Sequence, residues 1–216
     1  MKRLFYRGAI GCSLLLGALN FSCSGPTVDV KSEREKFDIE KGILYYEHEL
    51  FSGTAVKYHA DGEIEESCEY DEGKKNGEYS EYYRNPKGQI KEEGNFVDNE
   101  KDGKWTKYYE NGKVELAKVF VAGKYDGRYE SFYDNGQLKY TVTYKLGVKS
   151  GNEKSFFENG KLKEISVYKS GQKQGMCKTF FDNGKLRSIG NYINGNRAGI
   201  YKEFDQQGKL TYSSMY

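Results

Sequence analysis

Residues 127–151 read GRYESFYDNGQLKYTVTYKLGVKSG, and this stretch holds one complete copy of a unit that recurs through the chain. The copy opens with Gly127, carries two adjacent aromatic residues before Asn135-Gly136, and ends where Gly151 opens the next copy. The opening glycine returns every 24 residues, at Gly103, Gly127, Gly151, Gly175 and Gly199. Self-similarity at a fixed period is typical of repeat architectures.

Each copy predicts a β-hairpin. The Asn-Gly and Asp-Gly pairs favour the two-residue type I′ turn, which needs positive φ at both central residues. Extended runs rich in Tyr, Phe, Val and Ile flank these pairs, and no 3.6-residue apolar period is visible. We therefore predict an all-β fold: an elongated antiparallel sheet of tandem 24-residue hairpins over 37–216, with a leading half unit that ends at Tyr46. Its units start near residues 53, 77, 103, 127, 151, 175 and 199.

The predicted turn also sets the expected register. A two-residue turn at Asn135-Gly136 places Tyr133 opposite Leu138, and the next unit places Phe157 opposite Leu162. These pairs should share one face with the following rings: Trp105, Tyr129, Tyr144 and Tyr168.

The first aromatic of each adjacent pair should point to the opposite face. This row of rings is the candidate binding surface, because exposed apolar patches often mark interaction sites. Its members are Tyr82, Tyr108, Phe132, Phe156 and Phe180. The alternative is that the rings only cover one another along the sheet. Open strand edges near Tyr46 and Tyr216 are a second candidate surface, since an unpaired edge can add a strand from another chain.

Residues 1–22 differ in composition from the rest of the chain. Basic residues precede an apolar run from Ala9 to Phe21, which predicts a signal peptide. Cys23 follows directly, as in the lipobox of bacterial lipoproteins, although Asn20 stands where that motif usually has Leu. We expect lipidation at Cys23, the alternative being an ordinary signal peptide cut elsewhere. Residues 23–36 are polar and are predicted to form a tether.

Charge and residue usage limit the function classes. Removal of Lys2, Arg3 and Arg7 with the signal peptide lowers the basic residues from 34 to 31, against 32 acidic residues. A nearly neutral chain gives little reason to expect a nucleic-acid partner. The two histidines, His48 and His59, do not stand at metal-ligand spacing, and we expect no cofactor.

Two further expectations follow from the repeat itself. Cys68 and Cys177 lie five units apart, about 50 Å along a sheet that advances about 10 Å per hairpin, so we expect no disulfide between them. Identical residues at identical places also work against catalysis, because an active site needs one asymmetric constellation. We therefore expect that the protein is not an enzyme.

The units resemble the MORN repeat in its bacterial variant form, found in antitoxin-like proteins of the YwqK type. The resemblance rests on Gly-x-x-x-x-Tyr/Phe-Tyr/Phe-x-Asn-Gly-x-Leu followed by Tyr-x-x-Gly-x-x-x-Gly, and it covers about residues 37–216. It implies an antiparallel β array and a non-enzymatic role as a scaffold, a dimerisation module or a lipid contact.

Together these features predict a lipid-anchored repeat scaffold of the bacterial cell envelope, periplasmic or surface-exposed. It would mediate protein–protein interaction, with an unknown protein partner or with itself, and would reach the membrane through its lipid anchor. A lipid-headgroup or glycan binding module is the first alternative, and a YwqK-type antitoxin is the second.

Overall fold

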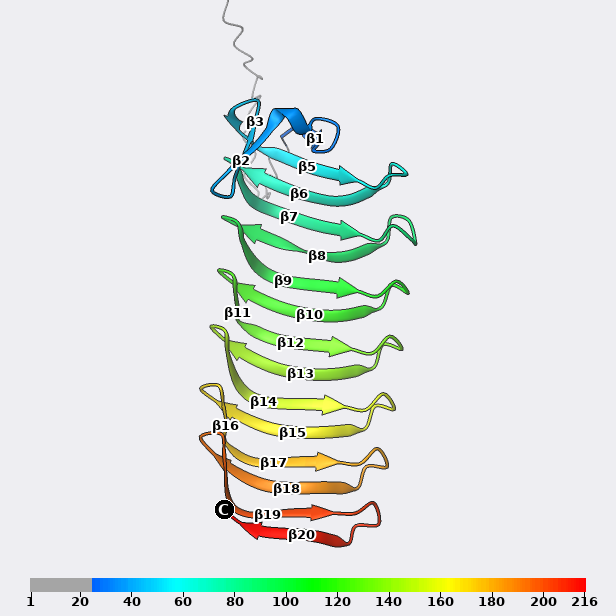
Figure 1. The fold of residues 1–216 in the computed structure, drawn as a ribbon, viewed down its shortest axis with the longest axis vertical. Coiled ribbons are helices and arrows are strands. Elements are labelled where there is room, and N and C mark those ends of the chain that lie inside the picture. The colour runs from blue at the N-terminus through cyan, green and yellow to red at the C-terminus, as the bar shows by residue number, and fades with distance from the viewer. Residues whose placement is uncertain (1–24) are drawn as a thin grey trace, which may run out of the picture.

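The computed structural model describes residues 25–216, so the expected signal peptide over 1–22 and Cys23 lie outside the described residues. Figure 1 shows one long, single-layered sheet whose strands stack in chain order along the long axis. Every neighbouring pair in the repeat array is antiparallel. The prediction of an elongated all-β array of tandem hairpins is confirmed. None of the described residues forms a helix with the length and apolarity that a membrane crossing requires.

The array consists of seven hairpins of similar length. Their strands are β5 (Gly53–Tyr58) with β6 (Ile64–Asp71), β7 (Lys74–Tyr82) with β8 (Ile90–Val97), β9 (Glu100–Tyr108) with β10 (Val114–Val121), β12 (Gly127–Phe132) with β13 (Leu138–Lys145), β14 (Val148–Phe156) with β15 (Leu162–Lys169), β17 (Gly175–Phe180) with β18 (Leu186–Ile193), and β19 (Asn196–Phe204) with β20 (Leu210–Met215). Two short strands, β11 (Lys124–Tyr125) and β16 (Gln172–Lys173), lead into β12 and β17.

The N-terminal end of the sheet is covered. β1 (Thr27–Asp29) pairs in parallel with β5, followed by a 3-10 turn at Arg34–Lys36. A separate small sheet packs here, formed by β2 (Phe37–Glu40), β3 (Ile43–Tyr46) and β4 (Glu49–Leu50). Its apolar cluster consists of Val28, Leu44, Phe51 and Ala55.

This end differs from the two sequence expectations for it. Val28 belongs to the sheet and is buried, so residues 27–36 are not a free tether. Residues 37–50 form their own sheet, not the half unit that was expected to end at Tyr46.

The turn at the Asn-Gly pairs is of a different type from the one predicted. At Asn135-Gly136 the Gly136 N–H donates to the Tyr133 carbonyl at 2.8 Å, and the Tyr133 N–H donates to the Gln137 carbonyl at 2.8 Å. Gly136 has φ +90°, whereas Asn135 does not have positive φ. This is a three-residue loop, a type I turn closed by a glycine bulge, and the predicted type I′ turn is wrong. Asn159-Gly160 forms the same loop.

Type I′ turns close the opposite ends of the hairpins, between one unit and the next. Leu146 and Gly147 have φ +49° and +82°, and the flanking Lys145 pairs with Val148. Asn194 and Gly195, two units further on, have φ +49° and +83°. Leucine rarely adopts this conformation, so sequence preference alone did not identify the turn.

The turn error shifts the expected register by one residue. Leu138 pairs with Phe132, not with Tyr133, and Leu162 pairs with Phe156, not with Phe157. A one-residue slip exchanges the two faces of a strand. The leucines therefore lie on the face of the ring row and not, as predicted, on the face of Trp105.

We call the side that carries Trp105 the tryptophan face. Trp105 is completely buried there, and it packs with Tyr79, Phe96 and Phe120. The buried positions of successive hairpins form a continuous column on this face, through Cys68, Val142, Glu153, Ser166, Cys177 and Tyr201. Neighbouring units bury one another's side chains, as stacked repeats do.

Candidate functional site

The ring row lies on the opposite face, which is the side away from Trp105. Each ring ends the first strand of its hairpin and pairs with an aliphatic residue on the second: Tyr82 with Ile90, Tyr108 with Val114, Phe132 with Leu138, Phe156 with Leu162, and Phe180 with Leu186. All five rings are half-buried. Within residues 25–216 no two of them make an aromatic contact, so aliphatic residues separate the rings along the row.

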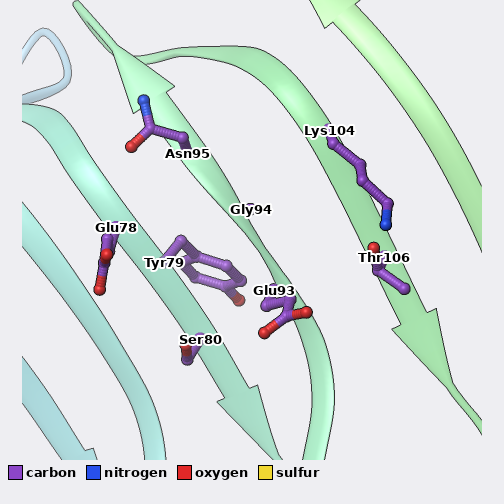
Figure 2. Close-up of a pocket in the computed structure, with 8 residues that line it drawn as sticks. All are labelled: Glu78, Tyr79, Ser80, Glu93, Gly94, Asn95, Lys104 and Thr106. Carbon is purple, nitrogen blue, oxygen red and sulfur yellow. The ribbon is translucent and has the colours of Figure 1, made fainter.

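A polar hollow lies on the opposite face across β7, β8 and β9 (Figure 2). Its volume is about 330 Å³, and its lining consists of Glu78, Tyr79, Ser80, Glu93, Gly94, Asn95, Lys104 and Thr106. Gly94 at its centre contributes no side chain, and the space on the other side of the sheet is filled by the Trp105 ring. The large ring and the small residue are thus complementary across neighbouring strands.

Hydrogen bonds within the chain hold the carboxylates of Glu93 and of the neighbouring Glu69. Glu93 accepts from the Tyr108 hydroxyl at 2.6 Å, and the Glu78 N–H donates to a carboxylate oxygen of Glu69 at 2.9 Å. Burial raises the pKa of Tyr108, and the hydrogen bond to Glu93 adds to the increase. The hollow is thus lined by charged groups of both signs, from Glu78, Glu93 and Lys104. Among residues 25–216, no three His, Cys, Asp or Glu side chains are arranged to hold a metal ion.

A second hollow, of about 230 Å³, occupies the equivalent place around Gly190. Its lining is mainly apolar: Met176, Ile189, Gly190, Asn191, Ile200 and Lys202. Here the ring on the other side of the sheet is Tyr201, which a Cβ at Gly190 would approach to 2.5 Å. The same backbone feature thus forms a polar hollow near one end of the array and an apolar hollow near the other.

Three lysines form a column on the opposite face that the sequence reasoning missed. Lys154 and Lys178 both pair with Ile165, and Lys178 and Lys202 both pair with Ile189. Residues paired across strands share a face, so the column alternates lysine with isoleucine. The 24-residue spacing of the three lysines was a signal that could have found it, once the correct register was known.

The other residues singled out from the sequence lie apart from these surfaces. Cys68 and Cys177 are both free and buried, on β6 and β17. Burial raises the pKa of the Cys68 thiol to about 11, which keeps it protonated at neutral pH. The Nδ1 atom of His48 lies 3.4 Å from Oδ2 of Asp38, beside the small N-terminal sheet. His59 lies in the loop between β5 and β6.

Comparison with known proteins agrees with the repeat geometry. The family model described as the MORN repeat variant matches residues 101–120, 125–146, 149–170 and 173–194. A search of curated proteins finds no match. The matched segments each contain a central hairpin loop with the strands on both sides of it. The chain therefore carries four tandem MORN repeat variants within its β-hairpin array.

Proposed function

We propose that the protein is a lipid-anchored interaction scaffold of the bacterial envelope, in which the opposite face of the MORN-type array binds a partner protein. The observation that carries this proposal is the periodicity of that face. The ring row and the lysine column repeat at intervals of one hairpin, about 10 Å. A surface built in this way suits an extended contact that crosses several units.

The two faces differ in which side chains they leave exposed to a partner. On the tryptophan face, large rings and ion pairs contact one another: Lys101 lies over Trp105, and Lys149 is paired with Glu153 at 2.6 Å. On the opposite face, by contrast, Met176 and Ile200 are each 55 % exposed. Exposed apolar side chains on the same face as half-buried rings favour a binding role for this side.

The membrane anchor is proposed from the sequence, and it can be tested separately. A cell that makes the wild-type chain should incorporate labelled fatty acid into it and retain it in the membrane fraction. The Cys23→Ser variant should lose both properties, with Cys12→Ser as the control for the other cysteine near the N-terminus. Equal labelling of the wild-type and Cys23→Ser chains would refute lipidation at this residue.

The interaction role is tested by capture of partners from envelope extracts. Wild-type protein should retain one main protein, and Phe132→Ala and Phe156→Ala should each weaken retention by a similar step. Each ring is expected to contribute about 0.5–1.5 kcal/mol. Leu146→Ser, at a turn that is 61 % exposed, is the matched apolar-to-polar control. Retention of only lipid or glycan would favour those alternatives, and turnover of a captured small molecule would contradict the scaffold.

A further inference from the structure

The charge of the opposite face changes along the array. Over β6 to β12 its side chains include the carboxylates of Glu69, Glu78, Glu93 and Glu130, together with Lys104 and Arg128. Over β14 to β20 the ladder positions of the same face carry no carboxylate among the described residues. Their charged members are Lys169, which lies beside a type I′ turn, and three lysines within their strands, Lys154, Lys178 and Lys202. Within residues 25–216 none of these three lysines has a salt-bridge partner, whereas many other lysines do.

Apolar side chains occupy the positions around these lysines. Ile165 and Ile189 alternate with them along the column, and Met176 and Ile200 flank it along the strands. In three earlier units the places equivalent to Met176 and Ile200 carry charge, at Glu78, Lys104 and Arg128. The apolar hollow around Gly190 opens within this area. We call the area, from Lys154 to Lys202 with these four apolar residues, the basic-apolar strip.

The spacing of the strip matches an α-helix. Successive lysines are two strands apart, about 9.6 Å, because neighbouring strands lie about 4.8 Å from one another. Seven residues of an α-helix advance about 10.5 Å. A helix laid along the array can therefore place an acidic residue near each lysine at i, i+7 and i+14. Apolar residues of the helix at i+3 or i+4 would then contact Ile165, and those at i+10 or i+11 would contact Ile189.

We propose that the basic-apolar strip is a docking site for an amphipathic helix of a partner protein, with acidic residues at heptad spacing and aliphatic residues between them. The inference rests on the proposed function, because it names the partner chemistry for that face. An anionic membrane fits less well, since a single-layered sheet lying on it would also bring Glu78, Glu93 and Glu130 against the bilayer. A polyanionic chain offers charge but no aliphatic groups for Met176 and Ile200.

The test uses purified full-length protein and a synthetic helical peptide with Glu at positions i, i+7 and i+14 and Leu at i+3, i+4, i+10 and i+11. A second peptide has the same composition, with Glu at i, i+4 and i+8. One triple variant removes the three positive charges of the column: Lys154→Gln/Lys178→Gln/Lys202→Gln. The control, Lys124→Gln/Lys145→Gln/Lys169→Gln, makes the same charge change at exposed lysines beside the type I′ turns. Fluorescence anisotropy gives the affinities, and thermal melts confirm that both variants fold.

We expect saturable binding of the heptad peptide, weakened about tenfold in the column variant and changed less than twofold in the control. The second peptide should bind several-fold more weakly. Absence of binding, equal binding of both peptides, or equal loss in both lysine variants would overturn the proposal. Column-dependent binding of phosphatidylglycerol vesicles without binding of the heptad peptide would also overturn it, in favour of a membrane. Partner capture that depends on Phe132 but not on the lysine column would retain the proposed function and reject only the strip.

Discussion

Gly94 lies directly beneath the Trp105 ring of the neighbouring strand, and a Cβ built on Gly94 would stand 2.2 Å from the ring atom Cδ2. This close approach allows a completely buried indole to lie flat on a single-layered sheet. The indole N–H is satisfied as well, because it donates to the Asn95 carbonyl at 3.1 Å. The widest ring of the tryptophan face thus depends on the smallest residue of the adjacent strand.

Gly94→Ala should destabilise the protein by about 1–3 kcal/mol, since the added methyl group forces Trp105 out of its position. Equilibrium denaturation measures this loss, and tryptophan fluorescence reports whether the ring moves, because Trp105 is the only tryptophan. A second substitution, Trp105→Leu, should recover part of the stability of Gly94→Ala. An unchanged denaturation midpoint in Gly94→Ala would show that the ring does not pack on this glycine.

The three-residue loop between Phe157 and Lys161 makes different demands on Asn159 and Gly160. Gly160→Val should cost about 1–3 kcal/mol, because φ is +79° at this glycine. Asn159→Ala should cost about 0.5–1.5 kcal/mol, through the loss of the hydrogen bonds from its amide to the Asp182 carbonyl and from the Lys161 N–H to its side chain. Thermal melts measure both. If Asn159→Val were as damaging as Gly160→Val, Asn159 would have positive φ and the type I′ assignment would return.

Leu146 and Asn194 occupy equivalent places in two type I′ turns, and exchanging their residue types gives opposite predictions. Leu146→Asn should stabilise the protein by about 1 kcal/mol, because asparagine tolerates φ +49° better than leucine does. Asn194→Leu should destabilise it by a similar amount for the same reason. Chemical denaturation of the two variants checks both signs. A loss of stability in both would mean that Leu146 contributes packing that outweighs its backbone strain.

The carboxyl group of Glu153, on the tryptophan face, makes the free energy of unfolding depend on pH. Burial favours protonation of this carboxyl, but hydrogen bonds from Lys149 and Tyr140 outweigh burial and lower its pKa below the ordinary 4.5. A lowered pKa contributes stability above pH 4.5, and this contribution is lost as the pH falls through the folded-state value. Glu153→Gln should therefore be less stable than wild type at pH 7, with a difference that narrows below pH 4.5. The exposed Glu158→Gln is the control, and a constant difference from pH 3 to pH 7 would contradict the assignment.

The fold followed from the sequence, because the glycine period and the paired aromatics report directly on repeated hairpins. The turn assignment failed because Asn135-Gly136 and Asn159-Gly160 satisfy two loop types, and both types need positive φ at the glycine. The type I′ turns were hidden by residues such as Leu146, whose conformation is imposed by the register of the strands around it. Local preference was therefore overridden by tertiary structure.

The same error concealed part of the candidate surface. The ring row was predicted on the correct face, because its residues alternate with Trp105 and Tyr129 along their strands. Its leucine partners were assigned to the wrong face, since their position depended on the loop. The lysine column could not be recognised until Lys178 was known to pair with both Ile165 and Ile189.

Photo-crosslinking in living cells tests the central claim most directly. A photoreactive amino acid placed at Asn152, Met176 and Ile200 samples equivalent points of the opposite face, whereas the same amino acid at Ser131, Ser155 and Thr179 samples the tryptophan face. The predicted result is that all three positions of the first set crosslink to one and the same protein and that the second set gives far less product. Equal crosslinking from both faces, or none from the first set, would contradict an interaction scaffold that binds through the opposite face.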